Sequence, residues 1–124
     1  MLRVLIVEDN LIFREAFKKN LFDYFPSMVI EEAAKGDEAL EKIKGGPPHL
    51  IFMDIRLPGV NGLQLTQRIK KDFPDINIGI LTDYDLPEYR QAAGQCGADR
   101  FYVKNSFKWD ELEGFVQSIS PGGR

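Results

Sequence analysis

Five short apolar runs are spread along the chain and separated by longer segments of mixed character. They are rich in Val, Ile, Leu, Phe and Met, and they cover residues 4–7, 28–30, 50–53, 78–81 and 101–103. The first, third and fourth runs are nearly continuous, which is typical of strands that helices cover on both faces of a parallel sheet. The second and fifth runs are shorter and pass into polar residues, as edge strands do. The pattern predicts five strands, three of them central.

The segments between these runs carry apolar residues at helical spacing, three or four positions apart. The residues that form one face of each predicted helix are Phe13, Phe17 and Leu21; Ala39 and Ile43; Leu65, Ile69 and Phe73; Leu86, Tyr89, Ala93 and Cys96; and Trp109, Leu112, Val116 and Ile119. Glycine and proline at 45–48 and 72–75 separate a helix from the next strand. Strand and helix therefore alternate five times, which predicts right-handed βαβ units and a parallel sheet.

Length and composition indicate one globular domain. The chain has 124 residues, of which 44% are hydrophobic and 28% charged, as in ordinary globular proteins. We find no internal repeat, low-complexity stretch or interdomain linker. We expect one α/β domain over residues 1–120, with residues 121–124 as a C-terminal tail or the beginning of a linker.

Charge and cysteine content exclude several classes of function. Sixteen basic and 19 acidic residues give a net charge of −3, which disfavours binding of this domain to nucleic acid. No apolar run approaches the roughly 20 residues that cross a bilayer, and the N-terminus does not resemble a signal peptide. Cys96 is alone, which excludes an internal disulfide and a cysteine-rich zinc site. His49 has no partner at metal-ligand spacing, so we assign it to a surface loop. We expect a cytoplasmic protein without a membrane partner.

Polar residues follow four of the five predicted strands. Glu8 and Asp9 come after the first strand, Asp54 after the third, Thr82 after the fourth and Lys104 after the fifth. Each alone is an ordinary cap, turn or surface residue. In a parallel α/β sheet, however, the carboxyl ends of the strands meet at one edge, where ligands bind. We therefore expect these five side chains to converge.

The predicted cluster suggests a chemistry. Three carboxylates and one ammonium leave an excess negative charge, which a hard divalent cation such as Mg²⁺ neutralises. With such a cation, the cluster can hold a phosphoryl group through the lysine and the hydroxyl. One carboxylate can then act as nucleophile and form an aspartyl phosphate. Asp54 is the best candidate, because it ends the central strand and precedes a turn.

The sequence resembles the receiver domains of bacterial two-component response regulators over its whole length. The resemblance is carried by residues 4–10 (VLIVEDN), 53–62 (MDIRLPGVNG), 81–82 (LT), 97–99 (GAD) and 103–104 (VK). It implies a CheY-like, flavodoxin-like fold: a (βα)5, doubly wound, five-stranded parallel sheet in the order 2-1-3-4-5.

The family resemblance also implies residue roles. Glu8, Asp9, Asp54 and the backbone carbonyl of Arg56 would bind Mg²⁺, and Asp54 would accept the phosphoryl group. Thr82 would hydrogen-bond that group and Lys104 would pair with it. Phe101, three residues before the lysine, occupies the position of the aromatic switch residue, whose ring moves inward as Thr82 moves to the phosphate.

The partners follow from the same resemblance. A sensor histidine kinase or phosphotransfer protein would donate the phosphoryl group, so that the domain is a phosphoacceptor that promotes its own phosphorylation rather than a turnover enzyme. The segment 104–106 (KNS) resembles receivers of helix-turn-helix transcription factors, and a downstream effector domain or protein would read the switch and control transcription. Homodimerisation through the fourth or fifth helix stays open.

Some positions depart from the usual receiver pattern. Asn105 stands where many receivers have proline after a cis bond, and a non-proline cis bond costs about 2.5–4 kcal/mol, so we expect a different loop here. Asp83 stands where receivers commonly have Ala or Gly, and it could repel phosphate or turn outward. Arg56 and Tyr84 occupy positions that modulate the lifetime of the phosphoryl group, and we expect them to shield it from water.

Other functions remain as alternatives. A receiver-fold interaction module that works without phosphorylation is favoured by Asp83 and opposed by the complete set of pocket residues. A flavin carrier is disfavoured, because the acidic residues after the first strand would repel its phosphate. A phosphatase of the haloacid dehalogenase type would need an aspartate two residues after the nucleophile, where this chain has Arg56.

Overall fold

A computed structural model describes residues 1–119 of the chain. Its main element is a five-stranded parallel sheet in the order β2-β1-β3-β6-β7. The strands are β1 (Arg3–Val7), β2 (Val29–Ala33), β3 (Leu50–Asp54), β6 (Asn77–Thr82) and β7 (Arg100–Val103). Because β4 (Arg56–Leu57) and β5 (Val60–Asn61) form a separate antiparallel hairpin, β6 and β7 are the fourth and fifth strands of the main sheet. The predicted strand order is therefore confirmed.

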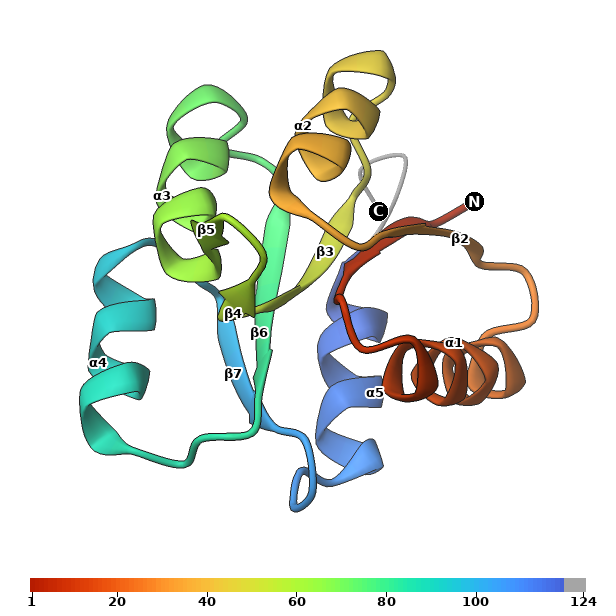
Figure 1. The fold of residues 1–124 in the computed structure, drawn as a ribbon. Helices are drawn as coiled ribbons and strands as arrows, with labels where there is room; N and C mark the ends of the chain where they lie inside the picture. The colour runs from red at the N-terminus through yellow and green to blue at the C-terminus, as the bar shows by residue number, and fades with distance from the viewer. Residues whose placement is uncertain (120–124) are drawn as a thin grey trace.

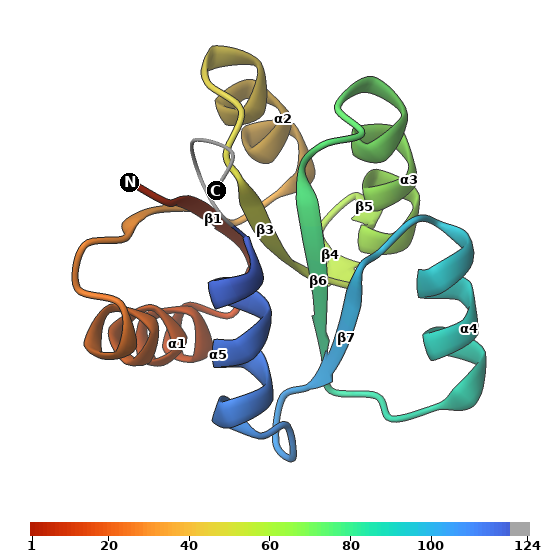
Figure 2. The ribbon, with the colours of Figure 1, turned by 180° about the vertical axis from the view of Figure 1, so that it is seen from behind.

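Helices cover both faces of this sheet, as Figures 1 and 2 show. On one face lie α1 (Leu11–Tyr24) and α5 (Trp109–Ser118); on the other lie α2 (Gly36–Gly45), α3 (Gly62–Asp72) and α4 (Pro87–Gln95). Each connection between parallel strands carries a helix, so the chain has the doubly wound (βα)5 architecture expected from the sequence.

Successive strand residues point to opposite faces and separate two cores. In β3, Ile51 and Met53 face α2, α3 and α4, whereas Leu50 and Phe52 face α1 and α5. All of β3 is buried, which explains why its sequence is continuously apolar rather than alternating. The buried side chains of the first core are aliphatic, whereas the second contains several buried aromatic residues.

An aromatic column runs through the core between α1 and α5. The ring of Phe13 stacks on Phe17 with centroids 5.6 Å apart, and Phe17 stacks on Trp109 at 5.5 Å. Trp109 in turn stacks on Tyr24 at 5.0 Å. Phe107 contacts both Phe17 and Trp109 edge-on. Such offset and edge-on contacts are favourable aromatic geometries, and they fix α1 against α5.

Two elements differ from the sequence-based expectation. The edge strand β2 continues to Ala33 instead of ending at residue 30, because its last residue still pairs with Val7 of β1. The hairpin β4–β5 lies in the segment where the sequence predicted only a turn. Its turn contains Gly59 with φ +78°, a left-handed conformation that glycine adopts without a steric penalty.

No helix within residues 1–119 is long and apolar enough to cross a membrane. The proposed tail or linker at 121–124 lies outside the described residues, so the boundary after residue 120 stays a prediction.

Candidate functional site

Three acidic side chains meet at the carboxyl edge of the sheet. Glu8 and Asp9 follow β1 directly, and Asp54 is the last residue of the adjacent strand β3. One carboxylate oxygen from each lies within 4.8 Å of the others. Glu8 and Asp54 are buried, at 1% and 7% exposure, whereas Asp9 is exposed. The structure thus brings together the carboxylates that the sequence predicted would converge.

Lys104 follows β7 and reaches into the same cluster. Its Nζ lies 2.6 Å from Oε1 of Glu8 and 3.6 Å from Oδ2 of Asp54. The aromatic ring of Phe13 covers the ammonium, with 4.6 Å between Nζ and the ring centroid. Only 8% of the Lys104 side chain is exposed. One buried cation therefore serves two buried carboxylates.

The imbalance of charge changes the protonation of the cluster. Burial and the negative charge of Glu8 raise the pKa of Asp54 from 3.8 to about 7, although Lys104 opposes this shift. Burial lowers the pKa of Lys104, but its hydrogen bond to Glu8 and the nearby carboxylates outweigh burial and raise that pKa overall. Near neutral pH the Asp54 carboxyl is thus partly protonated, and an added cation would favour its charged form.

Thr82 ends β6 beside this cluster and is buried, at 1% exposure. Its hydroxyl accepts a hydrogen bond from the backbone N–H of Tyr84, at 3.2 Å. Phe101 pairs with Ile80, two residues before Thr82, so Thr82 and Phe101 are diagonal neighbours on the same face of the sheet. Arg90 of α4 places its guanidinium carbon 4.6 Å from the Phe101 ring centroid, which holds the half-buried ring at the surface.

The three expected modulators differ in their relation to the cluster, and Arg56 contacts it through its backbone, which hydrogen-bonds Asp54. Arg56, the first residue of β4, lies over the ring of Tyr84, with 4.7 Å between its guanidinium carbon and the centroid. The two side chains expected to shield the site therefore contact each other. Asp83 is exposed and is not part of the carboxylate group, although its charge helps to raise the pKa of Lys104.

The loop after Asp54 requires glycine at position 62. A Cβ atom on Gly62 would lie 1.9 Å from the backbone oxygen of Asp54, which no arrangement of a larger residue avoids without a backbone shift. Gly62 instead donates its N–H to the carbonyl of Ile55, at 2.6 Å. The hairpin β4–β5 thereby closes directly against the end of β3. The peptide bond between Lys104 and Asn105 is trans, as no cis bond occurs among residues 1–119.

Sequence reasoning missed several residues that hold the β1–α1 loop. Asn10 caps α1 by accepting from the Phe13 N–H, at 3.0 Å, and its own N–H donates to Glu8, at 3.0 Å. Arg14 donates to the backbone carbonyl of Glu8, at 2.6 Å, and pairs with Glu32 of β2, at 3.0 Å. An Asn directly before a predicted helix is a recognisable cap signal, but the role of Arg14 depends on tertiary contacts.

The donor set fits Mg²⁺. Mg²⁺ prefers oxygen ligands and is commonly held by one or two carboxylates together with water. Glu8, Asp9 and Asp54 offer carboxylate oxygens that are close to one another, and the exposure of Asp9 leaves access from solvent. Burial and the neighbouring Glu8 carboxylate raise the pKa of Asp54, and a cation bound between these carboxylates would oppose that shift.

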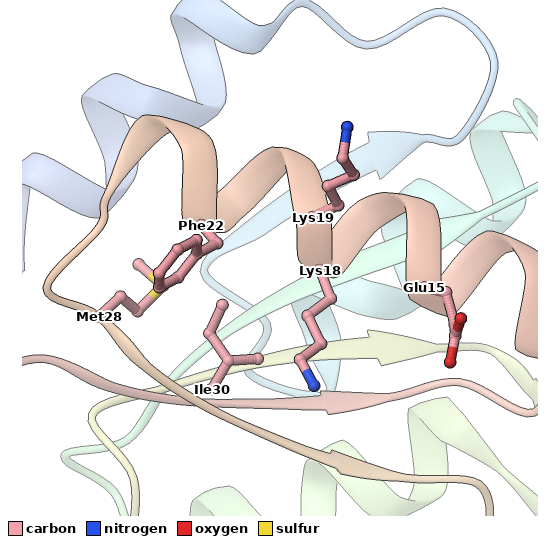
Figure 3. A pocket seen from close by; sticks show the side chains of 6 residues that line it. All are labelled: Glu15, Lys18, Lys19, Phe22, Met28 and Ile30. Carbon is pink, nitrogen blue, oxygen red and sulfur yellow. The ribbon is translucent and has the colours of Figure 1, made fainter.

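A surface hollow lies elsewhere, between α1 and the edge strand β2 (Figure 3). It has a volume of about 520 Å³, and its lining residues are Glu15, Lys18, Lys19, Phe22, Met28 and Ile30. Figure 3 shows the Phe22 ring beside Met28. Lys18 is already paired with Glu32, at 2.8 Å. The residues that line this hollow include one carboxylate, Glu15, whereas three are grouped at the carboxyl edge of the sheet. We therefore take the carboxyl edge as the candidate functional site.

Known proteins are similar to this chain in sequence and in fold. Residues 4–117 match the family described as response regulator receiver domain. Response regulator GacA of Pseudomonas protegens is 29% identical over 96% of this chain and 54% of its own length. Oxygen regulatory protein NreC of Staphylococcus carnosus is 34% identical over 85% of this chain and 49% of its own length. The chain thus spans about half the length of these curated relatives.

Among solved structures, a similar protein is response regulator protein TrrA from Thermotoga maritima, described in complex with Mg(2+)-BeF. It is 35% identical, with a TM-score of 0.83 over 97% of this chain and all of that chain. A receiver domain protein (CheY-like) from Methanospirillum hungatei, at 28% identity, gives a TM-score of 0.84 over 96% of this chain. Sequence, fold and the acidic cluster agree, and the chain belongs to the response regulator receiver domains of two-component systems.

Proposed function

We propose that this domain accepts a phosphoryl group on Asp54 in the presence of Mg²⁺, and that a sensor histidine kinase or phosphotransfer protein supplies it. The observation that carries the proposal is the grouping of Glu8, Asp9 and Asp54 within 4.8 Å, with Lys104 3.6 Å from Asp54. The description of TrrA in complex with Mg(2+)-BeF supports the same chemistry in a relative.

The transfer would be a displacement at phosphorus. An Asp54 carboxylate oxygen forms a bond to phosphorus, the phosphorus–nitrogen bond of a phosphohistidine breaks, and the leaving imidazole takes up a proton from solvent. Lys104 stabilises the negative charge of the transferring group, and Thr82 donates its hydroxyl hydrogen to a phosphoryl oxygen. Bound Mg²⁺, held by Glu8, Asp9, Asp54 and the Arg56 carbonyl, would neutralise charge on the phosphoryl oxygens.

Phosphorylation would then change the output surface. To reach a phosphoryl group, the Thr82 side chain would move from its present position, in which its oxygen accepts a hydrogen bond from the N–H of Tyr84. Its departure opens space next to Phe101 on the same sheet face. An inward movement of that ring, away from Arg90, would remodel the surface formed by α4, β7 and α5.

The wider role follows from the relatives. Several are named as transcriptional regulators, among them transcriptional regulatory protein DegU of Brevibacillus brevis. We propose that this domain is the signal-receiving part of a cytoplasmic regulatory system, that an effector domain or protein reads its state to control transcription, and that it acts as a phosphoacceptor rather than a turnover enzyme. Homodimer formation is a further hypothesis, and the domain itself would bind neither nucleic acid nor membrane.

The test is intact-mass measurement after incubation with acetyl phosphate, with and without Mg²⁺. The parent should gain one phosphoryl group only with Mg²⁺, and Asp54→Asn should gain none. Asp75→Asn is the matched control, because Asp75 is an exposed aspartate two residues before β6, at the opposite end of the sheet from Asp54. It should be phosphorylated like the parent.

Other outcomes have definite meanings. Phosphorylation of Asp54→Asn would place the acceptor elsewhere. Absence of phosphorylation in the parent together with a gain in Asp83→Ala would show a competent pocket that Asp83 blocks. If neither chain is phosphorylated, the proposal fails and the phosphate-independent interaction module replaces it.

A further inference from the structure

We propose that Phe13 is a positioning residue, whose ring holds the Lys104 ammonium where it meets the incoming phosphoryl group. This inference rests on the proposed function, since it concerns how the lysine of that site is held. The Phe13 side chain has no charge and no hydrogen-bonding group, so it acts on the site through Lys104.

The ammonium has three close neighbours of different character. Oε1 of Glu8 lies at 2.6 Å, Oδ2 of Asp54 at 3.6 Å, and the centroid of the Phe13 ring at 4.6 Å. A cation within about 6 Å of a ring centroid is attracted by the negative face of the ring, and this attraction increases when water is excluded. With 8% of the lysine side chain exposed, the contact belongs to the stronger class.

The ring itself is held firmly. The N–H of Phe13 donates to Oδ1 of Asn10, at 3.0 Å, which fixes the first turn of α1. Its ring stacks on Phe17 at 5.6 Å, with an angle of 14° between the planes. Phe17 is buried, at 2% exposure, and stacks on Trp109 of α5. The ring therefore cannot turn away from the pocket without disturbing the aromatic column.

An aromatic ring suits this position because it attracts the lysine without neutralising it. Glu8 and Asp54 both draw Lys104 towards the carboxylates, and a third carboxylate at position 13 would add to the negative charge that a phosphoryl group must approach. The ring adds no net charge. Lys104 thus keeps its charge for a phosphoryl oxygen while its position is restricted from the α1 side.

The experiment compares three substitutions in α1 by the rate of phosphorylation with acetyl phosphate and Mg²⁺. Phe13→Leu keeps an apolar side chain but removes the ring, and it should slow phosphorylation by about tenfold. Phe13→Tyr keeps the ring and should restore the rate to within about twofold of the parent. Phe22→Leu, on an exposed part of the same helix, should leave the rate unchanged.

A double-mutant cycle with Lys104→Met separates this role from simple packing, and its readout is the equilibrium constant of unfolding in urea without metal or phosphate. If the ring acts on the ammonium, Phe13→Leu should raise that constant about tenfold in the parent and less than threefold in Lys104→Met. An equal effect in both backgrounds would overturn the proposal, as would a Phe13→Tyr variant as slow as Phe13→Leu.

The cycle does not require phosphorylation. A parent that gains no phosphoryl group would refute the proposed function, while the unfolding cycle would still report whether the ring holds the lysine. Normal phosphorylation of Phe13→Leu, by contrast, would refute the positioning role and leave the proposed function intact.

Discussion

The two ends of the sheet use similar charged residues in opposite ways. At the amino end, Oδ2 of Asp99 accepts from the Ile78 N–H, at 2.8 Å, and pairs with Lys70, at 2.9 Å. At the carboxyl end, Asp54 shares one lysine with Glu8 at a longer distance of 3.6 Å. Asp99 therefore links two strands and a helix through its own partners. Among the described residues, Asp54 has no cation of its own, because Lys104 also pairs with Glu8.

The difference indicates that the carboxylate cluster at the carboxyl end lowers the stability of the fold. A buried carboxylate is stabilised by backbone donors and a dedicated cation, and it is destabilised by burial beside another carboxylate. Burial and Glu8 raise the pKa of Asp54 to about 7. Substituting an aspartate should therefore have opposite effects on stability at the two ends.

The largest effect is expected at the amino end. Asp99→Ala removes the acceptor for the Ile78 N–H and the partner of Lys70, and it should lower the free energy of unfolding by about 2–3 kcal/mol. Urea unfolding followed by circular dichroism measures this change. Asp99→Asn, which keeps an acceptor, should lose about half as much. Unchanged stability in Asp99→Ala would remove the contrast between the two ends.

A smaller effect of opposite sign is expected for Asp54→Asn without metal. Between pH 3.8 and about 7 the folded chain holds a proton on Asp54 that the unfolded chain releases, so the parent loses stability as the pH rises through this range. The variant lacks this loss. It should be more stable than the parent by about 2 kcal/mol at pH 8, and the gain should shrink as the pH falls towards 4.

Urea unfolding at pH 5, 6, 7 and 8, with chelator present, measures this gain. Saturating Mg²⁺ should stabilise the parent and reduce the advantage of the variant, since the cation balances the charge of the carboxylates. A variant that is less stable than the parent at pH 8 would contradict this prediction. It would show that Lys104 alone neutralises enough of the negative charge of Glu8 and Asp54.

The smallest effect is expected for Asp83→Ala, which sharpens the contrast within the carboxyl end. Asp83 is exposed and outside the carboxylate group, so its charge is screened by solvent. The substitution should speed phosphorylation by acetyl phosphate about twofold at low salt and not measurably at 0.5 M salt. A tenfold increase at high salt would instead show that the side chain blocks the entrance.

The fold was predictable because its signals are local and repeat along the chain. Continuous apolar runs identified the central strands, and the polar residue after each run gave Glu8, Asp54, Thr82 and Lys104 a common location. The contacts that complete the site are not local. Phe13 reads as an ordinary core position of an amphipathic helix, and only the folded chain places its ring over Lys104.

Two further features were missed for the same reason. His49 lies in the loop before β3, where it was predicted, but its contact was not foreseen: its Nδ1 accepts the Arg3 N–H, at 3.0 Å, across 46 positions of sequence. The hairpin β4–β5 is made of strands of two residues each, too short to give a periodic pattern. Its closure depends on the space left by Gly62 next to Asp54.

The aromatic column gives the protein a built-in optical probe. Trp109 is the single tryptophan of the chain, it lies between Tyr24 and Phe17, and only two stacked rings separate its indole from the Lys104 ammonium. Its emission spectrum is therefore a label-free signal from the interface between α1 and α5. We expect ligand binding that displaces Lys104 or the Phe13 ring to change this emission, which can be followed in the unmodified chain without an attached dye.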